Sequence, residues 1–140
     1  MLEGHTMRAL LAVLGAFVLV AGCSRTVSPA VRERIVQDFQ AGKFKPDSRG
    51  VVLLPSDLAA TSIGGRTFVT TNQTALWLLF RTWKGKAANM TGYLYAPGAP
   101  LKPGSEVTLT TDNIGVIVSA ESTVEKALGG GWYIVHRGYD

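Results

Sequence analysis

The sequence predicts an α+β fold, in which an N-terminal helix packs on a twisted antiparallel sheet of about five or six strands. Three observations lead to this prediction. One segment repeats apolar residues at helical spacing, several short segments are rich in β-branched and aromatic residues, and turn-forming residues separate these segments. A small β-barrel with helical decoration is the alternative, because one predicted strand is apolar on both faces and would also suit a closed barrel.

The predicted helix begins at Pro29. Ser28 suits the N-cap position before it, and proline is favoured at the first helical position, where its missing amide costs nothing. Apolar residues then recur every four positions from Val31 to Phe39, and Gly42 follows as a helix stop. We expect this apolar face to pack on the sheet.

The strongest strand signal runs from Thr74 to Trp83. In an extended conformation, one face carries Leu76, Leu78 and Phe80, and the other carries Trp77, Leu79, Arg81 and Trp83. A helix competes for this segment by apolar content alone, but its Trp, Phe and Thr residues favour a strand. Because both faces are apolar, we expect this strand to lie centrally in a sheet that is covered on both sides.

Shorter segments with the same composition complete the sheet. They are Val51 to Leu54, Thr67 to Thr71, Met90 to Ala96, Glu106 to Thr111, Ile114 to Ala120 and Trp132 to Arg137. Met90 to Ala96 is expected to form a hairpin with the Thr74 strand. A second hairpin is expected to turn at Asp112 and Asn113. Ser122 and Glu125 have the spacing of a capping box, which predicts a short helix that ends at the glycines 129–131.

The N-terminus has the pattern of an export signal. Arg8 precedes an uncharged apolar run from Ala9 to Val20, which is shorter than the ~20 residues that a transmembrane helix needs. Two small residues, Ala21 and Gly22, then precede Cys23, the single cysteine of the chain. Translation that starts at Met7 instead of Met1 would leave this pattern intact.

The stretch Val20, Ala21, Gly22, Cys23 resembles the lipobox of bacterial lipoproteins. The resemblance implies cleavage before Cys23, a diacylglyceryl group on its sulfur, and an acyl chain such as palmitate on its freed amine. Residues 1–22 would be the signal peptide, 23–28 the lipidated cysteine and its tether, and 29–140 a single small α+β domain. Ser24 stands where an aspartate would signal inner-membrane retention in the Gram-negative pattern, so the expected location is the outer membrane, facing the periplasm.

The composition offers little catalytic chemistry. The formal net charge is +4, and the charges are scattered without a basic block, so nucleic acid is not an expected partner. After processing, His136 is the last histidine and no cysteine thiol remains, which leaves too few ligands for a typical zinc site. No calcium-loop or nucleophile-elbow spacing occurs. We therefore expect no cofactor, no metal and no enzymatic activity.

These observations predict a lipid-anchored envelope lipoprotein that acts as a non-enzymatic binding or structural subunit for an envelope protein partner. The candidate contact surface is a hairpin tip that combines aromatic and basic residues: Arg81, Trp83, Lys84 and Lys86. The alternative is a carrier or sensor of a small apolar ligand. Its pocket would be lined by some of Trp77, Trp83, Tyr93, Tyr95 and Trp132.

Overall fold

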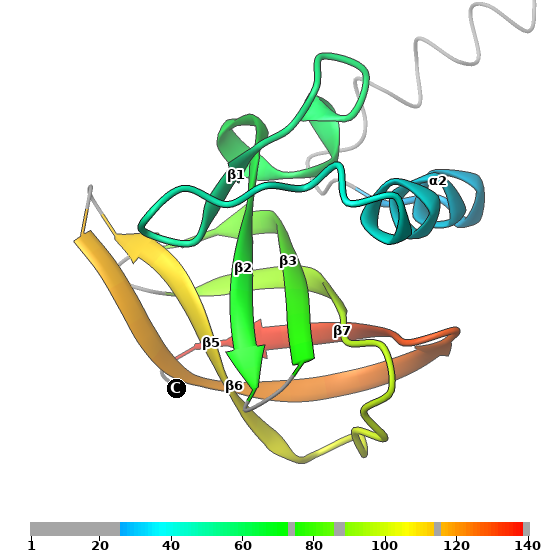
Figure 1. Ribbon diagram of the computed structural model, residues 1–140. Helices are drawn as coiled ribbons and strands as arrows, with labels where there is room; N and C mark the ends of the chain where they lie inside the picture. Colours follow the sequence, from blue (N-terminus) through cyan, green and yellow to red (C-terminus); the bar gives the residue numbers. More distant parts are fainter. Residues whose placement is uncertain (1–25, 73–74, 86–88, 114–115, 139–140) are drawn as a thin grey trace, which may run out of the picture.

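The fold is a curled antiparallel sheet with one helix outside it (Figure 1). The computed structural model describes residues 26–72, 75–85, 89–113 and 116–138. Seven strands form one sheet in the order β1-β2-β3-β4-β7-β6-β5. They are β1 (Val51–Leu53), β2 (Arg66–Asn72), β3 (Ala75–Lys84), β4 (Met90–Tyr95), β5 (Glu106–Asn113), β6 (Val116–Gly129) and β7 (Trp132–Arg137). The sheet curls into a half-barrel, so it combines the expected helix and sheet with the curvature of the barrel alternative.

The helix α2 (Pro29–Gln40) forms where the sequence predicts it. The Ser28 side chain accepts a hydrogen bond from the Val31 amide at 3.3 Å, and Pro29 occupies the first turn. After the helix, Gly42 adopts a φ of 70°, a conformation that suits glycine. Ile35 is fully buried beneath α2, against the outer face of the sheet. Between β1 and β2 lie two short 3-10 turns, η1 (Ala59–Thr61) and η2 (Ile63–Gly65).

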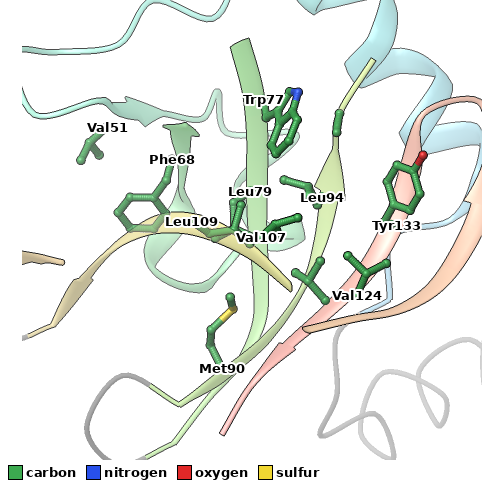
Figure 2. Close-up of a cluster of buried hydrophobic side chains, with 12 residues drawn as sticks. Val51, Phe68, Trp77, Leu79, Met90, Leu94, Val107, Leu109, Val124 and Tyr133 are labelled. Carbon is green, nitrogen blue, oxygen red and sulfur yellow. The ribbon is translucent and has the colours of Figure 1, made fainter. Parts of the chain in front are cut away.

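The central strand β3 is buried on both faces, as expected. Its Leu79 belongs to a core inside the half-barrel, and its Leu78 and Phe80 belong to a second core between the outer face and α2. Figure 2 shows the inner core, which comprises Val51, Phe68, Trp77, Leu79, Met90, Leu94, Ala96, Val107, Leu109, Val124, Tyr133 and Val135. Full burial of each large apolar side chain contributes about 1.5–3 kcal/mol, so the two cores account for the curvature and for the position of the helix.

Both predicted hairpins form, because β3 pairs with β4 and β5 pairs with β6. The predicted turn at Asp112 and Asn113 is wrong: both residues belong to β5, and Asp112 pairs with Ile117. The strand extends this far because Asp112 is buried and makes ion pairs inside the fold.

The helix predicted after Ser122 is also wrong, since β6 continues through Gly129. Ser122 and Val124 point inward and are buried, and β6 pairs with both β5 and β7. Register shifts between Val124 and Lys126, and again before Gly129, break the two-residue alternation. Pairing on both edges therefore overrides the capping-box pattern, which arose by coincidence of spacing.

Candidate functional site

The expected hairpin tip is divided between the two faces of the sheet. Arg81 pairs with Gly92, whereas Trp83 pairs with Thr91, because the register shifts between these two β3 residues. Adjacent residues of β4 point to opposite faces, so Arg81 and Trp83 do as well. The expectation that they share one face is therefore wrong, and the reason is a β-bulge that the sequence pattern does not reveal.

Arg81 lies inside the half-barrel, where it is only 3% exposed. Its Nη2 donates to Asp112 Oδ1 at 2.8 Å, and its Nη1 donates to the Asp112 carbonyl at 3.2 Å. The guanidinium also lies 4.7 Å from the centre of the Phe68 ring. Burial lowers the pKa of Arg81 from its usual value, and the Asp112 charge opposes that shift. Arg81 therefore links β3 to β5 and is not part of an exposed tip.

A second arginine reaches the same carboxylate. Arg66 on β2 lies 3.1 Å from Asp112 Oδ2, so arginines of two neighbouring strands converge on one residue of β5. Arg137 of β7 is also buried, and it donates to the Leu109 and Ala120 carbonyls at 2.8 and 3.0 Å. These contacts connect β5 and β6 to the rest of the sheet. We call the group Arg66, Arg81 and Asp112 the arginine clasp; Arg137 is not part of it.

The exposed part of the hairpin tip is Trp83 with Lys84. Trp83 is 46% exposed, and Lys84 is exposed beside it, while Lys86 lies outside the described residues. The indole ring lies over Gly85, since a Cβ added there would be 2.3 Å from Trp83 Cη2. On the outer face, Trp83 is paired across the strands with Thr91 of β4, which is paired in turn with His136 of β7. Trp83 is therefore exposed on the outer face, whereas Lys84 pairs with Met90 of the inner core and points to the opposite face at the end of the strand.

The five aromatic residues of the carrier alternative lie in two layers. Trp77 is in the inner core, whereas Tyr95 and Trp132 pack together in the outer core with ring centres 5.0 Å apart. Phe39 of α2 meets the Tyr95 ring edge-on at 5.5 Å, and burial raises the pKa of the Tyr95 phenol. Trp83 is on the outer surface, so the five do not converge on one pocket.

His136 lies on β7. It pairs with Thr123 and Thr91, and its ring packs on Gly138. No group of three histidine, cysteine, aspartate or glutamate side chains in the described segments is placed to hold a metal ion.

Two carboxyl groups meet near His136. The Glu121 carboxyl hydrogen-bonds to the Glu106 carboxyl and raises the pKa of Glu106. Sequence reasoning missed this carboxyl pair, since it depends on the β5–β6 register.

A groove of about 720 Å³ lies on the described part of the chain. It follows the seam where the two ends of the curled sheet approach each other: residues 46–50 and β2 form one wall, and β5 forms the other. Its lining includes Arg49, Thr70, Trp77, Glu106 and Thr108. The two walls are separated by more than thirty residues in the chain, so sequence reasoning did not find this groove.

The comparisons with known proteins return no match: no family model, no curated protein and no solved structure is similar to this chain. No helix among the described residues is both long and apolar enough to cross a membrane. Cys23, the expected lipidation site, lies outside the described residues.

Proposed function

We propose that this chain is a bacterial lipoprotein, anchored in the cell envelope through lipid on Cys23. The sequence Val20, Ala21, Gly22, Cys23 after a short uncharged apolar run supports the anchor. Each methylene that enters the bilayer contributes about 0.8 kcal/mol, and stable anchoring needs more than one acyl chain. A diacylglyceryl group together with an amide-linked chain meets that requirement. Ser24 favours the outer membrane, with the domain facing the periplasm.

The domain at the end of this tether is proposed to be a non-enzymatic binding or structural subunit. The observation that carries the proposal is the half-exposed Trp83 on the outer face of the hairpin tip, followed in the chain by the exposed Lys84. Tryptophan is enriched at protein interfaces because its large apolar ring also carries one hydrogen-bond donor. We propose Trp83, Lys84 and Lys86 as the contact residues for an envelope protein partner. Arg81 is omitted because it is buried in the arginine clasp.

Affinity purification from cross-linked envelopes tests this role. The tagged wild-type chain would be compared with a tip variant, in which Trp83, Lys84 and Lys86 are replaced by Ser. A matched control would replace Lys45 and Lys102, two exposed lysines elsewhere on the domain. Proteins and small molecules that co-purify would both be analysed by mass spectrometry.

The proposal expects one protein partner in stoichiometric amount, retained by the wild type and the lysine control and lost from the tip variant. A partner that the tip variant retains would remove these residues from the interface. A bound lipid or metabolite with no protein partner would contradict the subunit role and favour the carrier.

A further inference from the structure

One edge of β5 forms no backbone ladder with another strand. β5 is last in the sheet order, and its pairing with β6 uses only one edge. The Thr110 amide points away from β6, because it donates to Thr70 Oγ1 at 3.2 Å. Amides two residues apart in a strand share an edge, so those of Glu106 and Thr108 also point away from β6. Their spacing of about 7 Å is the repeat of an extended peptide.

Two common protections of a sheet edge, lysine and proline, are absent from this part of β5. Natural edge strands are commonly guarded by lysine, proline or a covering segment. From Glu106 to Thr110 the residues are Glu, Val, Thr, Leu and Thr, with neither lysine nor proline among them. Val107 and Leu109 are buried and hold the strand in place, while Thr108 is exposed. This edge is therefore rigid and open to a further strand.

The groove beside this edge has a firm opposite wall. The Asp47 carboxylate accepts hydrogen bonds from the Arg49 and Val51 amides at 2.8 and 3.0 Å, which fixes the loop of residues 46–50. These hydrogen bonds lower the pKa of Asp47, so it remains charged at neutral pH. β2 and β5 meet at the contact between Thr70 and Thr110, and the groove follows β5 from there toward Glu106.

We infer that the seam groove binds one extended polypeptide segment of a partner protein, which adds to β5 as a further strand through Glu106 and Thr108. A second copy of this chain fits less well, since its own β5 would bring β6 with it against the loop of residues 46–50. Arg49 on one wall and Glu106 on the other favour a segment that carries both signs of charge. The inference shares with the proposed function only the expectation of a protein partner.

A peptide selection with two matched variants tests the inference. The full-length chain, purified in detergent, would be used to select from displayed random peptides of about 12 residues, long enough for one strand. Synthetic copies of the selected peptides would then be titrated against the wild type, Thr108→Ala and Thr108→Pro. Thr108→Ala keeps the edge amide, whereas Thr108→Pro removes that amide and leaves the β5–β6 hydrogen bonds intact. If Thr108→Pro fails to fold, Glu106→Pro at the first residue of β5 makes the same test.

The inference expects Thr108→Pro to bind at least about tenfold more weakly than the wild type, because a lost hydrogen bond leaves a peptide carbonyl unpaired. Thr108→Ala should bind nearly as well as the wild type. Hydrogen exchange of the Thr108 amide should slow when peptide binds. The inference is overturned if no selected peptide binds the wild type, or if the proline and alanine variants bind equally well.

The two proposals can fail separately. Absence of any envelope partner would contradict the proposed function, whereas the peptide titration needs no cell envelope. A partner that depends on Trp83 but is insensitive to Thr108→Pro, together with peptides that do not bind, would leave the proposed function standing and reject the seam groove as a site.

Discussion

The arginine clasp makes a quantitative prediction for Asp112→Asn. Asp112 and Arg81 are both almost fully buried, with 2.8 Å between Oδ1 and Nη2. At an effective dielectric constant of about 20, Coulomb's law gives about 6 kcal/mol for unit charges at this distance. The asparagine retains part of the hydrogen bonding, and removal of one partner of a buried pair generally costs about 3–5 kcal/mol. We therefore expect Asp112→Asn to lower the free energy of unfolding by about 3–5 kcal/mol.

Urea unfolding of the chain from residue 24 onward, followed by circular dichroism, measures this loss. The matched control is Arg66→Gln, which removes the partner of the same carboxylate at 3.1 Å, a side chain that is 36% exposed. Solvent screens that pair, so its loss should cost less than about 1 kcal/mol. The reasoning is refuted if Asp112→Asn unfolds within about 1 kcal/mol of the wild type, or if Arg66→Gln is equally destabilising.

Three further predictions follow from local geometry. Gly92→Ala should lower the melting temperature and reduce the free energy of unfolding by about 1–3 kcal/mol, because the new Cβ would lie 2.7 Å from the Phe80 carbonyl oxygen. An unchanged melting temperature would contradict this prediction. Gly85→Ala should displace the indole of Trp83, and loss of the nuclear Overhauser contacts between residues 83 and 85 would show it. Glu106→Gln should gain stability relative to the wild type as the pH rises from about 4 to 7, since the raised pKa of Glu106 means that folding favours its protonated form; parallel stability curves would refute this.

Local signals predicted much of the secondary structure. The N-cap at Ser28 and the four-residue apolar repeat placed α2 correctly, because both depend only on neighbouring residues. The two apolar faces of β3 likewise predicted its central position. Wherever a strand has no bulge, the alternation of successive residues was sufficient to predict which side chains share a face.

The errors occur where bulges or distant contacts decide the structure. In β6, register shifts place Val124 in the inner core and Leu128 in the outer core, whereas a helix would have put them on one side. The bulge after Arg81 separates it from Trp83 in the same way. Asp112 lies 31 residues from Arg81, and no periodic pattern in a single sequence reports such a contact.

The seam groove and the Glu106–Glu121 carboxyl pair have the same origin. Both are created by the curvature and register of the sheet, not by a local motif. The hairpin tip was predicted correctly only as a hairpin, because solvent exposure of its side chains depends on the register of three neighbouring strands.

The proposed location and role both depend on the anchor at Cys23, and the intact mass of the protein purified from envelopes tests it most directly. The account predicts a chain that begins at Cys23 and carries the mass of a diacylglyceryl group and an amide-linked acyl chain, and a Cys23→Ser variant that lacks both additions. A wild-type chain that retains residues 1–22, or that begins elsewhere without lipid, would contradict the account.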